Sequence, residues 1–395
     1  MGKTLYILAT FIMPFFMTVT SLSCKRDVTR VRDGVRDYVS REDISPSLRI
    51  LLLDRVKKAS LAVDGRYQIL GSLSNVIDQG MRLGKTTVSV KEGYIYIGNK
   101  RYYNSELRIK NLEDSGVGVD NIRYRGEIRI LQQIDDKLSV IEEIEIENFV
   151  AGVLGCEMPN AWEDNALRSQ AVAIRTYVEN QRKAKGNKSY HIDRSELAYK
   201  GMIGETAKSR KMVQDTADIV MAYKGEIFSA FFHSTCGGHT EDVNLVFGKD
   251  RLPPLAGVKC GYCNNTKYFS WNVNIAKSSI MQKLKNANIR VSNIISVKAI
   301  NPGPGNHGSE VEIIETNGME RMNANRFRLL VGPNSLYSTA FTAKNNGSSI
   351  KFSGKGWGHG VGLCQYGAQG MAKKGYNWRD ILEYYYPKSE LRRLN

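Results

Sequence analysis

The stretch GVLGCEMPNAWEDNALRSQAVAIRTYVENQR, residues Gly152–Arg182, places one acidic residue between a turn of small residues and a long helical pattern. This residue, Glu157, is followed by a methionine and a proline. Apolar residues then recur at the spacing of one helix face, at Leu167, Ala171, Ile174 and Val178. We expect an amphipathic helix capped by Asp164 or Asn165, which would hold the Glu157 carboxyl in a fixed position. The sequence therefore indicates a carboxyl suited to general acid–base catalysis.

The composition is that of an ordinary globular protein with a strong positive charge. Of 395 residues, 42% are hydrophobic and 24% are charged, which is enough for one large core or two ordinary ones. The net charge of +16 favours polyanionic partners such as nucleic acid, anionic lipid or the acidic polymers of a bacterial wall. The sequence has no zinc finger, aromatic RNA-binding signature or long basic run, so we expect no nucleic-acid partner.

The N-terminus has the features of a bacterial export signal. The apolar run Leu5–Val19 has about the length of a signal-peptide core, and Pro14 within it argues against a stable spanning helix. Cys24 lies before two basic residues in a loose lipobox, although Ser21 stands where an aliphatic residue is usual. We expect an exported, extracytoplasmic protein of the cell envelope or periplasm. Its N-terminus would be lipidated at Cys24 and so anchored to a membrane, simply cleaved, or kept as an uncleaved anchor.

The chain has the pattern of an α+β protein with several parts. After a signal segment at 1–24, residues 25–45 are polar and predict a tether. Strand-like runs separated by glycine turns fill 46–145, which predicts a β-rich N-terminal module. Residues 146–395 mix helical and strand patterns. They predict a domain that forms a cleft, with a smaller α+β subdomain at 270–345.

Two segments of the second half have the composition of site loops. An expected strand, Ile227–His233, leads into the polar loop 234–241. Further on, glycines alternate with other residues over Gly354–Gly362, which predicts a strand with one face that lacks side chains. Because glycine weakens a strand, we expect another segment or a ligand to approach this face closely. Two helices should follow, starting near Gln365 and at Trp378.

Two arginines, Arg168 and Arg175, project from the edge of the predicted helix face, two turns apart. Each could lay its stem on apolar surface and keep its charged head in water. The alternative is a pair of cations that point into a cleft beside Glu157.

The cysteine count favours a metal site over a disulfide framework. If Cys24 is lipidated, an odd number of cysteines remains, which does not suit complete pairing. Cys156 and Cys364 are interpreted as small buried residues and are given no function.

Four soft or borderline metal ligands occur in two pairs, Cys236-x-x-His239 and Cys260-x-x-Cys263. Paired ligands at this spacing fit a closed tetrahedral zinc site, with His233 as an alternative to His239. Because three cysteines leave no open position for water, such a zinc would be structural. The alternatives are a Cys260–Cys263 or Cys236–Cys260 disulfide, or free buried thiols.

Three separate blocks carry a resemblance to a known family. They are Gly152–Gln181 around Glu157-Met158-Pro159, the loop His233-Ser234-Thr235-x-Gly237-Gly238, and Gly356–Gly362 followed by Gln365-Tyr366-Gly367-Ala368. In this order they resemble the SpoIID/LytB family, the stage II sporulation protein D and amidase-enhancer group of bacterial cell-wall proteins. Softer similarity extends over nearly everything after residue 46.

The resemblance implies a lytic transglycosylase that cleaves peptidoglycan glycan strands, in the sporulation members strands already stripped of stem peptides. The family's catalytic acid corresponds to Glu157. One carboxyl can suffice, because it protonates the glycosidic oxygen and then takes the proton of the muramyl 6-hydroxyl, which closes a 1,6-anhydro ring. Hydrolytic glycosidases use two carboxylates; Glu163, Asp164 and Glu241 are weaker candidates for a second one. This chemistry needs no cofactor.

The resemblance also implies which residues bind glycan. Arg168 and Arg175 would pair with the lactyl carboxylate of muramic acid. Trp357 and Tyr366 could stack on sugar rings, and His359 is interpreted as part of the frame. The candidates for substrate binding are Arg168, Gln170, Arg175, Ser234, Thr235, Trp357, His359, Gln365 and Tyr366.

Two other functions fit the same residues. One is a non-catalytic protein that binds glycan and activates a separate N-acetylmuramoyl-L-alanine amidase. The other is a structural scaffold of the wall.

Overall fold

The structure, a computed structural model, describes residues 29–32, 35–38 and 47–394, so the predicted export signal and Cys24 lie outside the described residues. Within this described part, no helix has both the length and the hydropathy that crossing a bilayer requires.

The chain divides into two compact units, residues 1–45 and 46–395. The first unit contains two short strands, β1 (Thr29–Arg32) and β2 (Val35–Tyr38), which pair antiparallel. Both strands lie within the segment 25–45 that the sequence predicts to be a tether.

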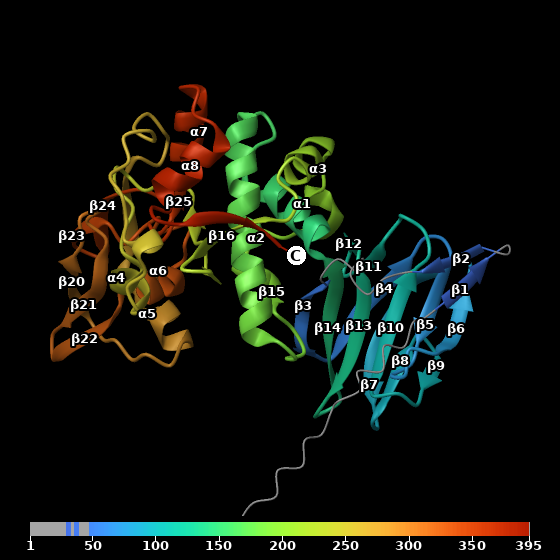
Figure 1. The fold of residues 1–395 in the computed structure, drawn as a ribbon. Coiled ribbons are helices and arrows are strands. Elements are labelled where there is room, and N and C mark those ends of the chain that lie inside the picture. Colours follow the sequence, from blue (N-terminus) through green and yellow to red (C-terminus); the bar gives the residue numbers. More distant parts are fainter. Residues whose placement is uncertain (1–28, 33–34, 39–46, 395) are drawn as a thin grey trace, which may run out of the picture. The chain divides into compact units, whose positions relative to one another are not determined.

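The second unit begins with two sheets, at the blue and teal end of its colouring (Figure 1). Their strands are β3 (Ser47–Val56), β4 (Lys58–Val63), β5 (Tyr67–Leu70), β6 (Val76–Gly80), β7 (Leu83–Lys91), β8 (Tyr94–Ile97), β9 (Lys100–Tyr102), β10 (Glu106–Asn111), β11 (Val117–Val119), β12 (Ile122–Tyr124), β13 (Glu127–Gln133), β14 (Lys137–Glu145) and β15 (Ile192–Asp193). One sheet has the order β15-β3-β14-β13-β10-β5-β6, and the other β12-β11-β4-β7-β8-β9. Apolar residues alternate along the strands, so that Leu107 and Ile109 of β10 are fully buried.

Helices and short strands make up the rest of the second unit, and they confirm the α+β class. The helices are α1 (Ile146–Glu157), α2 (Asp164–Lys185), α3 (Ala207–Gln214), α4 (Val243–Phe247), α5 (Lys277–Asn286), α6 (Ala324–Val331), α7 (Gln365–Lys373) and α8 (Trp378–Tyr385), with 3-10 turns η2 (Arg194–Glu196), η3 (Gly201–Gly204) and η4 (Pro253–Leu255). The strands are β16 (Ile219–Tyr223), β17 (Glu226–Ile227), β18 (Phe232–His233), β19 (Ser270–Ala276), β20 (Ile294–Pro302), β21 (Gly308–Glu315), β22 (Gly318–Asn323), β23 (Phe341–Asn346), β24 (Ser349–Lys355), β25 (Leu363–Cys364) and β26 (Glu390–Arg393).

The long helix α2 runs between the N-terminal sheets and the C-terminal elements (Figure 1). Its predicted apolar face is confirmed, because the side chains of Leu167, Ala171, Ile174 and Val178 are all buried. Neither predicted residue caps it: the N-cap position is Glu163, whose side chain makes no capping hydrogen bond.

The small residues before Glu157 form the last turns of α1 and not the expected turn. They allow η3 to pack against α1 backbone to backbone. A methyl group built on Gly155 would lie only 2.0 Å from the carbonyl oxygen of Gly204. Because Gly155 has no side chain, η3 lies directly against the last turns of α1.

The C-terminal part has a core of its own. Buried residues between Trp271 and Phe352 form a second hydrophobic cluster. Two three-stranded sheets, β19-β24-β23 and β20-β21-β22, contribute to it together with α5 and α6. The Pro302–Gly305 turn predicts a hairpin, and β20 and β21 pair antiparallel across this turn. The expected strand Ile227–His233 is interrupted, because only its two ends, in β17 and β18, are paired.

The stretch 356–362, called the glycine loop below, is a loop and not the expected strand. Its glycines, Gly356, Gly358, Gly360 and Gly362, have positive φ angles of 76, 120, 85 and 71°. Glycine adopts such angles without the strain that a side chain brings. The expected close approach of another segment is confirmed, because a methyl group on Gly358 would lie 2.6 Å from Cβ of His233.

The imidazole of His307 is buried against this loop. A methyl group on Gly360 would lie 2.6 Å from its Nε2, and its Nδ1 lies 2.8 Å from Oγ1 of Thr339. Burial lowers the pKa of His307 to about 3, and the neighbouring His233 and Arg328 act in the same direction. The folded protein therefore keeps this ring neutral over a pH range in which the unfolded chain protonates it.

Adding one methyl group tests the contact between α1 and η3. Gly155→Ala should lower the free energy of unfolding by about 1–3 kcal/mol, because the new Cβ meets a carbonyl held by packing. Urea unfolding followed by circular dichroism measures the change. Gly318→Ala is the control, since nothing lies within 4 Å of its Cβ position, and it should stay within about 0.5 kcal/mol of wild type. Equal, small effects of both substitutions would contradict the tight packing.

Stability should also decrease as the pH falls below the usual pKa of histidine. Because the folded-state pKa of His307 is lowered, the unfolded chain binds the additional proton between about pH 6.5 and the folded value of about 3. From pH 7 to pH 4.5, this group alone should reduce the free energy of unfolding by about 2–3 kcal/mol. His307→Gln should lose that part of the pH dependence in urea unfolding. A variant with the wild-type slope would contradict the assignment.

Candidate active site

The end of α1 forms one wall of a cavity of about 470 Å³. Its lining comes from α1, α2, η2, β18, α4, α6 and the glycine loop. The lining residues are Glu157, Tyr177, Glu196, Leu197, Phe231, Phe232, His233, Phe247, Arg328, Leu329, Gly358 and His359. The three sequence blocks that contain Glu157, His233 and His359 are thus brought together around one cavity.

The Glu157 carboxylate is held from two sides. Its Oε1 accepts a hydrogen bond from the backbone N–H of Ala198, at 3.0 Å. Its Oε2 accepts one from Nε2 of Gln365, also at 3.0 Å. Gln365 is buried and opens α7. Two donors from distant segments therefore fix the orientation of the carboxylate, which is what a positioned acid–base group needs.

A second carboxylate, Glu196, lines the cavity, and the sequence reasoning did not single it out. Its Oε2 accepts a hydrogen bond from the Tyr177 hydroxyl at 3.0 Å, and its Oε1 accepts one from the backbone N–H of Asp193 at 3.1 Å. Lys185 forms an ion pair with it. Asp193 and Glu196 form the capping box of η2. The Asp-x-x-Glu spacing predicts this capping role but does not predict that Glu196 lines the cavity.

The second acids suggested from the sequence lie elsewhere. Asp164 forms ion pairs with Lys208 and Arg168. Glu241 is buried and accepts a hydrogen bond from the backbone N–H of Gly305, at 2.8 Å. Neither of these residues, nor Glu163, is among the residues that line the cavity.

Two neutral imidazoles, His233 and His359, form part of the cavity wall, with ring centroids 5.5 Å apart. Burial lowers the pKa of His233 to about 4 and holds that of His359 well below its usual value. Nδ1 of His359 accepts a hydrogen bond from the backbone N–H of Val361, which assigns the proton to Nε2. Nδ1 of His233 lies 3.1 Å from the Val361 carbonyl oxygen, which leaves Nε2 as an acceptor without a partner among the described residues.

A buried arginine, Arg328 of α6, also lines the cavity. Its Nε donates to the carbonyl oxygen of Tyr337 at 2.8 Å, and its Nη1 lies 3.5 Å from Oδ1 of Asn325. Burial lowers its pKa to about 10, and no acidic neighbour offsets this among the described residues. The cavity therefore contains a partly desolvated cation with no carboxylate partner from that part of the chain.

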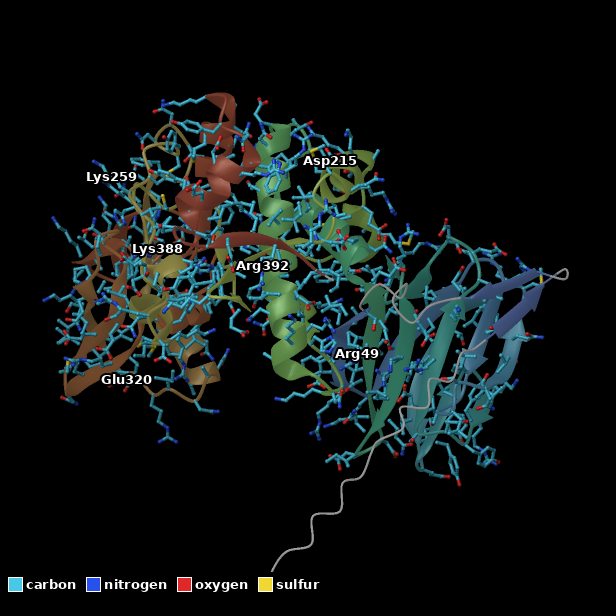
Figure 2. The ribbon with its side chains drawn as sticks, in the orientation of Figure 1. Arg49, Asp215, Lys259, Glu320, Lys388 and Arg392 are labelled. Atoms are coloured by element: carbon cyan, nitrogen blue, oxygen red, sulfur yellow. The ribbon has the colours of Figure 1, made fainter. Side chains whose placement is uncertain are left out.

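The two arginines of α2 do not point into this cavity. Arg175 has no exposed side-chain area and forms a two-pronged ion pair with Glu147, at 2.6 and 2.7 Å. Its Nη1 donates to the carbonyl oxygen of Ile219. The expectation that Arg175 faces the cleft is therefore wrong, because burial and protein partners use the whole guanidinium group. Arg168 pairs with Asp215, which lies at the end of α3 (Figure 2).

Several other predicted binding residues have packing roles and do not line the cavity. Gln170 is fully buried, and neither side-chain polar atom has a partner among the described residues. Thr235 is buried, and Ser234 Oγ lies 3.3 Å from its Oγ1. The ring of Trp357 packs against that of Tyr268 at a centroid distance of 4.3 Å, tilted by 55°. Burial keeps Gln170 and Thr235 from contacting a glycan directly, whereas the partly exposed Ser234 and Trp357 stay candidates for binding outside the cavity.

Tyr366 lies close to the site in sequence but contacts a different surface. Its ring packs edge-on against Trp162, at a centroid distance of 4.9 Å, and its backbone N–H donates to the carbonyl oxygen of Ser234. Gln365, its neighbour, instead contacts Glu157 directly. Of the predicted binding residues, His359 lines the cavity and Gln365 holds the acid.

The cysteines gather in a different set from the predicted one. Cys236, Cys260, Cys263 and Cys364 place their sulfur atoms within 4.8 Å of one another, and all four are buried free thiols. The disulfides considered as alternatives to the zinc site, Cys260–Cys263 and Cys236–Cys260, are therefore not formed. The imidazole of His239 lies outside this group, with Nδ1 against the carbonyl oxygen of Thr240. Cys364 replaces it because β25 pairs in parallel with β18, just before Cys236.

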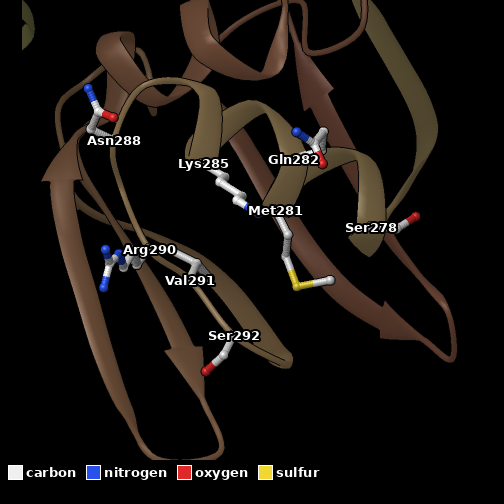
Figure 3. Close-up of a pocket in the computed structure, with 8 residues that line it drawn as sticks. All are labelled: Ser278, Met281, Gln282, Lys285, Asn288, Arg290, Val291 and Ser292. Carbon is white, nitrogen blue, oxygen red and sulfur yellow. The ribbon is translucent and has the colours of Figure 1, made fainter.

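A larger cavity, of about 840 Å³, lies far from this chemistry between α5 and the segment that follows it (Figure 3). Its described lining residues are Ser278, Met281, Gln282, Lys285, Asn288, Arg290, Val291 and Ser292. None of these carries a carboxyl, imidazole or thiol group, so the smaller cavity at Glu157 is the better candidate for a reaction site.

Comparison with known proteins finds family models for two parts of the chain. A family model described as Stage II sporulation protein matches residues 134–223, which include Glu157. A second model, for a domain of unknown function (DUF8618), matches residues 255–362.

Three curated relatives cover large parts of the chain. An uncharacterized protein of Brachyspira hyodysenteriae is 31% identical over 86% of this chain and 91% of its own length. Stage II sporulation protein D of Bacillus subtilis is 27% identical over 64% of this chain and 75% of its own length. The amidase enhancer of Bacillus subtilis is 23% identical over 90% of this chain and 57% of its own length. On this evidence the chain belongs to the SpoIID/LytB family of bacterial cell-wall proteins.

Proposed function

We propose that this protein is a lytic transglycosylase that cleaves peptidoglycan glycan strands, with Glu157 as the general acid and base. The observation that supports this most directly is a carboxylate held by two donors on the wall of a cavity. The other carboxylate of the lining, Glu196, already has a hydroxyl, a backbone N–H and a lysine as partners. One acid is therefore available for the reaction, which favours ring closure over hydrolysis.

The reaction needs two proton transfers at the same carboxyl. Glu157 first donates its proton to the glycosidic oxygen, as the bond from that oxygen to C1 of the muramyl residue breaks. The resulting carboxylate then takes the proton of the muramyl 6-hydroxyl, whose oxygen forms the new bond to C1. The carboxyl is protonated again at the end, and no water is consumed. The neutral rings of His233 and His359 offer uncharged hydrogen-bonding groups to the bound sugar.

Arg328 supplies the charge that the sequence reasoning assigned to Arg168 and Arg175. A muramyl residue without its peptide carries a lactyl carboxylate, and a guanidinium group binds carboxylates through two parallel hydrogen bonds. Because Arg328 is buried in the cavity wall without an acidic partner among the described residues, a carboxylate of the substrate would relieve its desolvation. The proposed substrate is thus a glycan strand with free lactyl groups.

This substrate lies outside the cytoplasmic membrane, so the proposal includes export through the N-terminal signal and lipid anchoring at Cys24. A second function, activation of a separate amidase by glycan binding, has support from the similarity to an amidase enhancer over most of the chain. Both functions use the same glycan-binding cavity, and only one of them requires turnover.

Replacing each of the two cavity carboxylates distinguishes these functions. Incubation with peptide-free glycan should give 1,6-anhydromuramyl ends, detected by mass spectrometry. Glu157→Gln should lower the rate by about 100-fold or more, because the amide cannot donate or accept the proton. Glu196→Gln should keep the rate within about tenfold and give the same anhydro product, since Glu196 takes no part in the proton transfers.

Other outcomes of this experiment would contradict the proposal in different ways. Full activity of Glu157→Gln would exclude Glu157 as the acid. Reducing ends in place of anhydro ends, lost in both variants, would indicate a two-carboxylate hydrolase. A wild-type protein that produces no new ends but accelerates an added amidase would establish the enhancer function.

The carboxylate-binding role of Arg328 predicts a substrate-dependent defect. Arg328→Met should raise KM for the lactyl glycan by about 10–100-fold, the value of a lost charged hydrogen bond. With glycan whose lactyl groups are methyl esters, the variant and wild type should differ little. Arg326→Met, on the same helix but exposed, is the control and should keep the wild-type KM. Equal KM values of Arg328→Met and wild type on the free acid would end the assignment.

A further inference from the structure

The four buried thiols come from three segments that lie far apart in the sequence. Cys236 follows β18, Cys260 and Cys263 belong to the loop after η4, and Cys364 ends β25 at the start of α7. Tertiary folding therefore brings these sulfur atoms together. All four thiols are buried in the hydrophobic core, where four adjacent sulfur atoms indicate a shared role.

Their spacing is that of ligands around one metal ion. The Sγ atoms of Cys236 and Cys263 are 3.6 Å apart, and those of Cys260 and Cys263 are 3.9 Å apart. A tetrahedral ion with metal–sulfur bonds of about 2.3 Å sets its ligand sulfurs about 3.8 Å apart. A disulfide needs about 2.0 Å between sulfurs. These two separations are too long for disulfides and match the ligand spacing around one tetrahedral ion, and all four sulfur atoms lie within 4.8 Å of one another.

Several hydrogen-bond donors surround the sulfur atoms. The backbone N–H of Gly238 donates to Sγ of Cys236 at 3.4 Å. Sγ of Cys364 accepts from the backbone N–H groups of Cys236 and Gly367, both at 3.3 Å. Such donors stabilise the negative charge of metal-bound thiolates and orient them, which is the usual outer shell of a metal site.

Glycines make the close approach possible at this point. Gly237 and Gly238 have φ angles of 72 and 120°, which turn the chain tightly after Cys236. A Cβ on Gly367 would lie 2.9 Å from Sγ of Cys260 and 1.9 Å from the Tyr385 hydroxyl. The backbone of α7 therefore lies directly against the thiol group.

We propose that Cys236, Cys260, Cys263 and Cys364 bind one zinc ion as a closed structural site. Four thiolates in tetrahedral positions suit zinc and leave no ligand position for water or substrate. The site would tie two walls of the Glu157 cavity together. Cys364 directly precedes Gln365, whose amide holds the Glu157 carboxylate, and Cys236 lies three residues after His233.

Metal analysis of the full-length protein with matched variants tests this site. The protein, purified without added metal, should contain about one zinc per chain by elemental analysis. Cys364→Ser should lose most of the zinc. His239→Asn and Cys156→Ser should keep it, since neither residue belongs to the thiol group. Iron in place of zinc, or zinc that is lost with His239→Asn and kept with Cys364→Ser, would overturn the proposal.

Because Cys364→Ser could fail to fold, two measurements on the wild-type protein complete the test. Cobalt exchanged into the protein should give the intense thiolate-to-cobalt absorption of a four-sulfur tetrahedral site. Alkylation of the native protein should leave the four cysteines unmodified until a strong chelator is added, and modify Cys156 in both conditions. Alkylation of these four cysteines as well as Cys156 without chelator, or a mapped disulfide among the four, would refute the site. Neither readout depends on glycan cleavage.

Discussion

The alternating glycines of the glycine loop, which leave room for neighbouring segments, are the constraint on which the site depends. A Cβ on Gly362 would lie 2.0 Å from the carbonyl oxygen of Phe231, and one on Gly358 would meet Cβ of His233. This loop leads directly into Cys364 and Gln365. A side chain at either glycine would push β18 and β25 apart, and with them the imidazole wall, the thiol group and the amide that holds Glu157.

Burial decides which charges take part in structure and which face the cavity. Arg175, on the helix beside the acid, uses its guanidinium group to fasten α2 to Glu147 of α1 and to Ile219 of β16. Arg328, from the second hydrophobic core, reaches the cavity without an acidic partner among the described residues. Removing Glu147 would leave the buried charge of Arg175 without a partner. The guanidinium group of Arg328 is already desolvated without an acidic partner among the described residues, so a bound anion stabilises it most.

The sequence correctly predicts those elements that depend only on residues close together in the chain. The apolar face of α2, the hairpin at Pro302–Gly305 and the start of α7 at Gln365 follow from periodicity and turn chemistry. The alternating glycines of 356–362 predicted a strand because strand side chains alternate with a period of two. A loop in which every second residue has a positive φ angle gives the same sequence pattern, so the sequence alone does not distinguish the two. The roles of Glu196 and Cys364 depend on tertiary contacts, so neither a capping box nor a lone cysteine could reveal them.

The hydrogen bond between Glu157 and Gln365 joins residues 208 positions apart in the chain. Such a contact can form only once the chain extends through Gln365 and the large loop between the two residues has closed. A chain that lacks its last segment, or has not yet finished folding, therefore presents the acid without the amide that orients it. If the protein cuts the wall that surrounds the cell, this dependence on the C-terminal segment keeps unfinished molecules from cutting it.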